Sequence, residues 1–242
     1  MRAFIAAIQF LTILPLGAKG TYAPRAMIPW FPAVGLLLGV LLAFFDQLVA
    51  YLWAPAAAAV LDVILLMVLT GALHLDGLGD TADGLYGHRP ADRALEIMKD
   101  SRIGAMALVT VVAVLALKWS GLAGVAQHRF LVLTLVPAYS RSAMLFGIRA
   151  LPYGRRSEGT GYDLFATPLG FRDFSGFIAV AALSLLLGWP ALILNLVYLV
   201  LVQLLLFYYR RKIGCITGDM LGAMAEITES ALFFLMAMEV WP

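Results

Sequence analysis

Long apolar stretches separated by short polar segments are the dominant pattern along this chain. Crossing the roughly 30 Å hydrocarbon core of a bilayer takes about 20 mostly apolar residues in an α-helix. The pattern predicts about seven such helices joined by short loops, at 31–53, 55–74, 104–123, 130–150, 174–188, 190–209 and 221–240. The boundary near residue 188 follows from the sequence Gly188-Trp189-Pro190, because proline lacks the backbone N–H that would continue a helix.

The first apolar segment, 4–14, is too short to cross a bilayer. We expect it to form a helix that lies at the membrane interface or enters only partway. Pro15 and Gly17 follow it where a secretory signal peptide would carry a small-residue cleavage site, so a cleaved leader is not predicted here.

Composition also indicates a membrane protein. Hydrophobic residues make up 62% of the 242 residues and charged residues 13%, against about 45–50% and 25% in soluble domains. We therefore predict an all-α, polytopic integral membrane protein in which residues 1–242 form a single membrane-embedded domain. A lone cysteine, Cys215, excludes an intramolecular disulfide.

The distribution of charge predicts the orientation. With seven helices and a cytoplasmic N-terminus, every lysine and arginine except Lys118, Arg129 and the mid-helix Arg141 falls on the cytoplasmic side, as the positive-inside rule requires. The carboxylates follow the same bias, with three exceptions at the outer ends: Asp46, Asp62 and Glu239. We expect the chemistry to gather at the cytoplasmic face, whereas a channel spreads polar groups through the membrane.

The strongest motif is the stretch 74–84, His-Leu-Asp-Gly-Leu-Gly-Asp-Thr-Ala-Asp-Gly. Its aspartates, Asp76, Asp80 and Asp83, are spaced i, i+4 and i+7, so in a helix they project from one face and repel one another. A hard divalent cation would offset that repulsion, and Mg²⁺ is commonly held by a few carboxylates together with substrate phosphates. A solvated acidic helix end or a flexible loop is the alternative.

Glycines and a histidine accompany these aspartates. Three glycines weaken the helix and leave room for a ligand near its backbone: Gly77, Gly79 and Gly84. His74 is a candidate general base, although a histidine at a helix end more often serves only as a hydrogen-bonding residue.

A second acidic stripe follows at 92–104, where Asp92, Glu96 and Asp100 share one helical face beside Arg93 and Arg102. This segment could share the metal and bind phosphate through its arginines, which match phosphate oxygens in bidentate fashion. The alternative is an amphipathic surface helix held together by ion pairs.

A third group lies at the start of the last predicted helix. Asp219 and Glu226 share a face, and Glu226 and Glu229 lie inside the predicted span, where ionisable groups are costly and are functional by default. Interhelical polar contact is the alternative. Arg141, in the middle of the fourth predicted span, requires a buried anionic partner, which is Glu226, Glu229 or a substrate phosphate.

The longest irregular segment, 151–173, contains Arg155 and Arg156 together with aromatic residues. It could act as a lid that binds phosphate and stacks on a base, or it could be a plain connection.

Four stretches of the chain resemble the cobalamin synthase family, the adenosylcobinamide-GDP ribazoletransferases. They are Phe-Pro-Ala-Val-Gly-Leu-Leu-Leu-Gly at 31–39, the stretch 74–84, Arg-Ala-Leu-Glu-Ile-Met-Lys-Asp-Ser-Arg-Ile-Gly at 93–104, and Thr-Gly-Asp-Met-Leu-Gly-Ala-Met-Ala-Glu at 217–226. A weaker similarity lies at 10–15, Phe-Leu-Thr-Ile-Leu-Pro. The stretches occur in the family's order and extend over essentially the whole chain.

The resemblance implies a Mg²⁺-dependent phosphotransferase of the bacterial inner membrane with its active site facing the cytoplasm. It would join adenosylcobinamide-GDP to α-ribazole or its 5′-phosphate and release GMP, a late step of vitamin B12 assembly. Its partners would be these small molecules and the lipid bilayer rather than nucleic acid, and a homo-oligomer stays open.

The resemblance also suggests site residues. The expected metal ligands are Asp76, Asp80, Asp83, Glu96, Asp100, Asp219 and Glu226. The expected catalytic residues are Asp83, Asp80, His74, Arg102 and Arg141. The expected substrate-binding residues are Arg93, Ser101, Arg155, Arg156, Gly218 and Gly222.

Two other functions fit part of the pattern. A lipid enzyme similar to the CDP-alcohol phosphotransferases also places aspartates with i+4 spacing on a membrane helix, but its fuller motif is not reproduced here. A divalent-cation or proton-coupled transporter would use intramembrane carboxylates such as Glu226 and Glu229, but typically shows repeats and polar groups at every depth.

Overall fold

The computed structural model describes residues 2–16, 23–155 and 161–239, and helices make up nearly all of the regular structure in these residues. The longer helices are α1 (Arg2–Leu11), α3 (Phe31–Leu52), α4 (Pro55–Thr70), α5 (Leu73–Leu85), α7 (Ala105–Gly124), α8 (Arg129–Ala150), α9 (Ser175–Ser184), α10 (Pro190–Lys212) and α11 (Gly218–Met236). The shorter ones are α2 (Pro24–Met27), η1 (Ile28–Trp30), α6 (Ala91–Ile97), η2 (Tyr162–Phe165), η3 (Phe171–Phe174) and η4 (Leu185–Leu187). The all-α prediction is confirmed.

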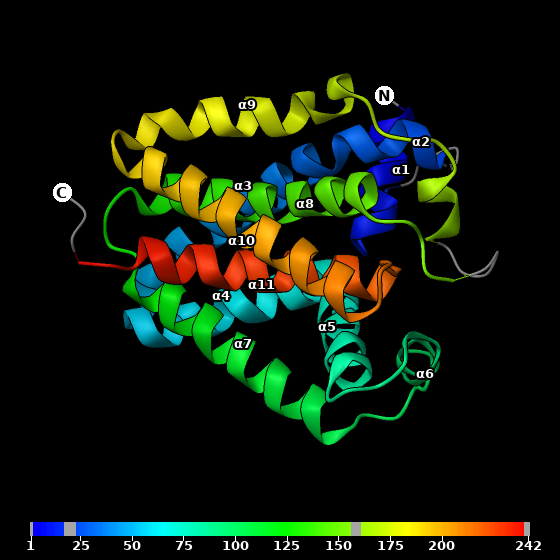
Figure 1. Cartoon of the computed structure of the whole chain (residues 1–242). Coiled ribbons are helices and arrows are strands. Elements are labelled where there is room, and N and C mark those ends of the chain that lie inside the picture. The colour runs from blue at the N-terminus through cyan, green and yellow to red at the C-terminus, as the bar shows by residue number, and fades with distance from the viewer. Residues whose placement is uncertain (1, 17–22, 156–160, 240–242) are drawn as a thin grey trace.

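The predicted spans appear as helices in the predicted order, with one correction. The stretch 55–74 was expected to be one helix, but α4 ends at Thr70 and α5 leaves it at an angle of 90°. Gly71 and Ala72 cause the bend, because both adopt left-handed backbone conformations, with φ of 60° and 55°. His74 therefore belongs to α5, which runs across the end of the bundle (Figure 1).

Four of the described helical segments are long and apolar enough to cross a membrane, and the bent pair α4–α5 adds a fifth. Helix α9 is only 10 residues long, and α11 carries Asp219, Glu226 and Glu229. The total of seven spans stays a prediction. Helix α1 is about 15 Å long over its 10 residues, half the thickness of a hydrocarbon core. As expected, it is too short to span a membrane.

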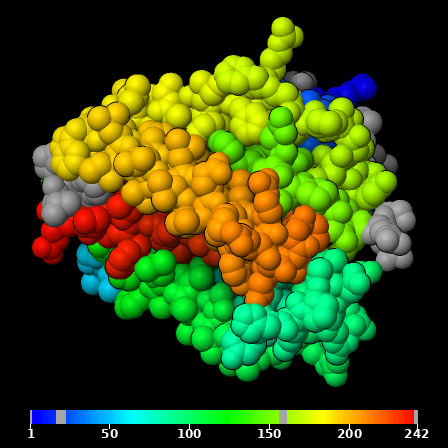
Figure 2. All heavy atoms as spheres, viewed as in Figure 1, coloured from blue at the N-terminus to red at the C-terminus, as the bar shows by residue number. Residues whose placement is uncertain are grey.

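Helix α11 forms the centre of the bundle and packs against α5, α7, α8 and α10. Figure 2 shows it in red between the orange α10 and the green α7. The N-terminus, α5 and α6 lie at one end of the molecule, and the C-terminus lies at the other (Figure 1). The acidic motifs thus share one end of the bundle.

Helices α3 and α8 approach each other closely because two glycines of α3 face the backbone of α8. A Cβ atom on Gly35 would overlap the carbonyl oxygen of Pro137, and one on Gly39 would overlap that of Thr134. Small residues at helix contacts are the usual means of packing in a membrane, where lipid is as apolar as leucine.

We expect Gly39→Ala to destabilise the protein. Alanine favours a helix over glycine by about 1 kcal/mol, but the overlap with Thr134 costs about 1–3 kcal/mol, so the melting temperature in detergent should fall. Gly170→Ala is the matched control, because the nearest atom to its Cβ lies 3.8 Å away. Equal melting temperatures for the two variants would contradict the close α3–α8 contact.

Candidate active site

Helices α5 and α11 cross with their backbones in contact. A Cβ atom on Gly77 would come within 2.7 Å of the carbonyl oxygen of Asp219, and one on Gly222 would lie 3.1 Å from the Cα of His74. At Gly84, the side chain of Met98 occupies the space that a Cβ atom would need. The expectation that the α5 glycines leave room for a ligand is therefore wrong for Gly77 and Gly84, because neighbouring parts of the protein occupy that space, whereas Gly79 lines a cavity.

This crossing brings together three carboxylates, those of Asp76 and Asp80 on α5 and of Asp219 in the first turn of α11. All three lie close enough to repel one another electrostatically. Asp219 accepts a hydrogen bond of 2.5 Å from Arg155, whereas the side chains of Asp76 and Asp80 have no hydrogen-bond or ion-pair partner among the described residues. The site thus carries excess negative charge.

Asp83 has a different environment from the other two aspartates of its stripe. Its carboxylate accepts hydrogen bonds from the backbone N–H groups of Gly104, at 2.7 Å, and Ala107, at 2.9 Å. These are orphan donors at the start of α7, where the helix dipole also favours a negative charge. The partner of Asp83 in this structure is therefore a helix N-terminus.

Two arginines flank the acidic group, and each is held by a carboxylate. Arg102 pairs with Asp100, and its guanidinium lowers the pKa of Asp100 to about 2. Arg155 donates to Asp219 and to the carbonyl oxygen of Met98 at 3.2 Å. Both arginines lie near the acidic group.

The second acidic stripe does not share one helical face as predicted, because α6 ends at Ile97 and Asp100 lies beyond it; its remaining residues lie at the surface. Arg93 forms an exposed ion pair of 2.5 Å with Glu96, as in the surface-helix alternative. Glu96 also lines a shallow pocket that reaches Arg155. Arg156 lies outside the described residues.

A buried charge cluster links α7, α8 and α11 inside the bundle. Lys118 donates to Glu226 at 2.5 Å and to Glu229 at 2.8 Å, and Arg141 pairs with Glu229. The requirement of Arg141 for a buried anionic partner is confirmed. Lys118 is buried, because it pairs with two carboxylates inside the bundle, and its expected place toward the non-cytoplasmic side of the membrane stays a prediction. Glu226 thus pairs with Lys118 inside the bundle, whereas Asp219 pairs with Arg155 at its end. The spacing of the two carboxylates in the sequence does not reveal these different partners.

Two cavities meet at Asp76. The first, of about 320 Å³, lies between α1, α5, α8, η2 and the start of α11, and is lined by His74, Asp76, Asp219, Gly218 and Gly222 among others. The second, of about 290 Å³, lies between α5 and the start of α7, and is lined by Asp76, Asp80, Ser101 and Arg102 among others. We call them the His74 cavity and the Arg102 cavity.

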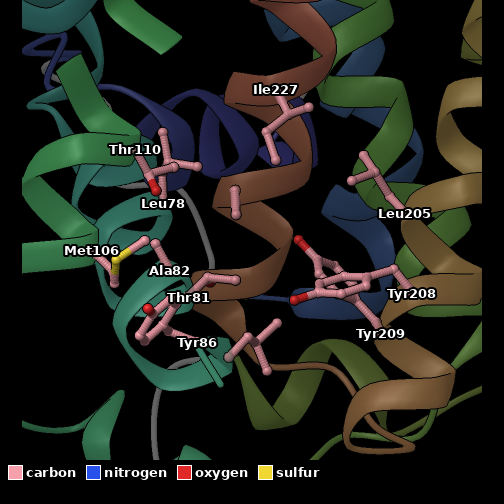
Figure 3. A pocket seen from close by; sticks show the side chains of 12 residues that line it. Leu78, Thr81, Ala82, Tyr86, Met106, Thr110, Leu205, Tyr208, Tyr209 and Ile227 are labelled. Carbon is pink, nitrogen blue, oxygen red and sulfur yellow. The ribbon is translucent and has the colours of Figure 1, made fainter. Parts of the chain in front are cut away.

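A third cavity, of about 260 Å³, lies between α5, α7, α10 and α11 and is not lined by acidic residues among those the structure describes. Figure 3 shows Thr81 and Ala82 of α5 facing Tyr208 and Tyr209 of α10. Its described lining includes threonine and tyrosine residues but no charged residue, so we take the two cavities that meet at Asp76 as the candidate site.

Sequence reasoning missed the part played by α1 in this site. Gln9 and Phe10 line the His74 cavity, and Phe10 stacks on Phe31 with ring centroids 5.9 Å apart. The weak similarity at 10–15 was the available signal, but a short apolar helix does not reveal where it docks.

The chemistry of the acidic group fits a hard divalent cation only in part. Carboxylate oxygens are the ligands that Mg²⁺ prefers, and those of Asp76 and Asp80 are free of protein partners in the described residues. Within the same residues, however, no three carboxylate, histidine or cysteine side chains converge closely enough to hold a metal ion. Such a site suits a cation that arrives with ligands supplied by a substrate.

Comparison with known proteins gives a consistent result. Residues 3–237 match the family model described as cobalamin-5-phosphate synthase. An adenosylcobinamide-GDP ribazoletransferase of Alkaliphilus metalliredigens is 36% identical over 98% of this chain and 96% of the relative. One of Roseiflexus sp. is 39% identical over 92% of this chain and 84% of the relative. No solved structure matches the chain significantly.

We expect Lys118→Met to destabilise the protein strongly. It leaves the buried carboxylate of Glu226 without a cation, and breaking a buried pair from one side costs about 3–5 kcal/mol. The double variant Lys118→Met/Glu226→Gln removes one charge of each sign and should recover most of the loss, as measured by thermal unfolding in detergent. A single variant as stable as the wild type would contradict the ion pairing.

Proposed function

Because the chain belongs to the cobalamin-5-phosphate synthase family, we propose that it is an adenosylcobinamide-GDP ribazoletransferase. It would join adenosylcobinamide-GDP to α-ribazole or its 5′-phosphate and release GMP. The observation that carries this proposal is the position of Asp76, whose side chain lines both the His74 cavity and the Arg102 cavity. A transferase needs two substrates to meet at one point, and Asp76 marks such a point.

The reaction forms one oxygen–phosphorus bond and breaks another. A ribose hydroxyl of α-ribazole attacks the phosphorus attached to cobinamide, and the bridging oxygen leaves with GMP. Asp76 would accept the proton of the hydroxyl, since its carboxylate lines both cavities and has no partner among the described residues. Phosphoryl transfer depends mainly on positioning and electrostatic stabilisation, which these groups can provide.

The two flanking arginines would bind the pyrophosphate. Arg102 and Arg155 are held by single carboxylates, Asp100 and Asp219. A pyrophosphate offers more charge and more acceptor oxygens than either carboxylate, and a guanidinium matches it in bidentate fashion. The arginines would exchange partners when the donor binds, which would also release Asp219.

Mg²⁺ is part of this proposal. Asp80 and the released Asp219 would hold it together with pyrophosphate oxygens, which leaves the nearby carboxylate of Asp76 to accept the proton. When bound, the ion would neutralise the developing charge on the pyrophosphate and on the leaving GMP. Because the described residues do not form a complete metal site by themselves, the affinity for Mg²⁺ should be low until the donor is present.

The site would face the cytoplasm of a bacterial cell. The support is the gathering of α5, α6 and the N-terminus at one end of the bundle (Figure 1), together with the cations predicted there. The curated relatives named above are bacterial.

The decisive assay uses purified protein with adenosylcobinamide-GDP and α-ribazole, with and without Mg²⁺. We expect GMP and the joined product to appear in equal amounts only when Mg²⁺ is present. GMP release without α-ribazole would indicate hydrolysis instead. The absence of any product at saturating substrates would contradict the proposed function.

Asp80→Asn and Asp83→Asn form a matched pair that tests the metal assignment. Asp80→Asn removes a free carboxylate from the acidic group, so we expect kcat/KM to fall about 100-fold or more and the Mg²⁺ concentration for half-maximal rate to rise. Asp83→Asn weakens the cap of α7, so the melting temperature should fall while the Mg²⁺ dependence stays that of the wild type. The same shift in Mg²⁺ dependence for both variants would contradict the different roles of the two aspartates.

A further inference from the structure

The His74 cavity contains an unsatisfied buried polar side chain. His74 is 2% exposed, and neither ring nitrogen has a hydrogen-bond partner. A buried donor or acceptor without a partner costs free energy, so native structures rarely leave one unless a water or a ligand completes it. His74 lines the cavity, and a neutral imidazole offers one donor and one acceptor there.

The rest of the lining is suited to a flat aromatic group. Phe10 of α1, Met144 of α8 and Leu221 of α11 contribute apolar walls from three different helices. On the α11 side, Gly218 and Gly222 have no side chains that would narrow the cavity. At about 320 Å³ the cavity lies within the size range of small-molecule sites, which are mostly apolar with a few placed polar groups.

Charge distinguishes this cavity from its neighbour. The described lining of the His74 cavity contains no lysine or arginine and includes the carboxylates of Asp76 and Asp219. The Arg102 cavity is also lined by two carboxylates, those of Asp76 and Asp80, but it adds the guanidinium of Arg102 and the hydroxyl of Ser101. The pyrophosphate of the donor therefore fits the Arg102 cavity, and an uncharged aromatic group fits the His74 cavity.

We propose that the His74 cavity binds the acceptor nucleoside, a ribose that carries a flat bicyclic aromatic base. This inference rests on the proposed function and adds the location of the acceptor. The base lies between Phe10, Met144 and Leu221, and its free ring nitrogen accepts a hydrogen bond from the imidazole of His74. The ribose hydroxyls point toward Asp76, where the attacking oxygen meets the donor. His74 is then a residue that recognises the base, in place of the general base expected from the sequence.

Direct binding of α-ribazole tests the proposal without requiring turnover. The protein is reconstituted in lipid nanodiscs, and titration calorimetry is performed with α-ribazole alone, with empty nanodiscs as the blank. We expect saturable binding at one site per chain in the wild type. The absence of saturable binding would overturn the proposal even if the enzyme turned over, whereas binding without turnover would leave it standing and count against the proposed function.

Two filling variants and a matched control locate the site. Met144→Trp fills the cavity from α8, and Leu73→Trp fills it from α5 at a half-exposed position that tolerates a larger side chain. We expect each to weaken α-ribazole binding about tenfold or more. Met106→Trp makes the same change as Met144→Trp in the cavity of Figure 3 and should bind as the wild type does. If the folded Leu73 and Met144 variants bind α-ribazole with wild-type affinity, the proposal is wrong.

An analogue that carries carbon in place of the free ring nitrogen tests the role of His74. The wild type should bind it about tenfold more weakly than α-ribazole, because the histidine donor is left without a partner. His74→Phe keeps a ring of similar size and should bind the two ligands equally. Discrimination that persists in His74→Phe would overturn the assignment of His74 to the base.

Discussion

The close crossing of α5 and α11 is the contact on which the rest of the site depends. Gly77 lies against the backbone of Asp219, and Gly222 lies against His74. A side chain at either glycine would force the helices apart. Because the two helices touch, Asp219 in the first turn of α11 lies beside Asp76 and Asp80 of α5. The two cavities that meet at Asp76 form on either side of α5.

Burial of charge explains why the chemistry lies at the end of the bundle. Inside it, the charges of Lys118, Arg141, Glu226 and Glu229 balance one another, as a low-dielectric interior requires. The carboxylates of Asp76 and Asp80 lack such partners in the described residues. They can carry uncompensated charge only where water or a cation and its phosphate ligands can reach them, and this condition is met at the end of the membrane domain.

The sequence predicted the helices well and the pairing of side chains less well. Apolar length located α3, α7, α8 and α10 within a few residues. Gly71 is a typical residue at which a helix ends, but the sharp bend was missed because the left-handed conformation of the following Ala72 depends on tertiary packing. The stripe of aspartates was recognised, but its spacing could not show that Asp83 would cap α7. The partner of Glu226 was missed for the same reason, since Lys118 lies on a different helix.

The central claim is that Asp76 lies where the two substrates meet, and Asp76→Asn tests it most directly. The measurement is the single-turnover rate of GMP release at saturating Mg²⁺ and saturating substrates, with α-ribazole binding measured on the same preparation. We predict a rate lower by about 100-fold or more, with α-ribazole affinity within threefold of the wild type. A single-turnover rate near that of the wild type would contradict the assignment of Asp76 to the meeting point of the two cavities.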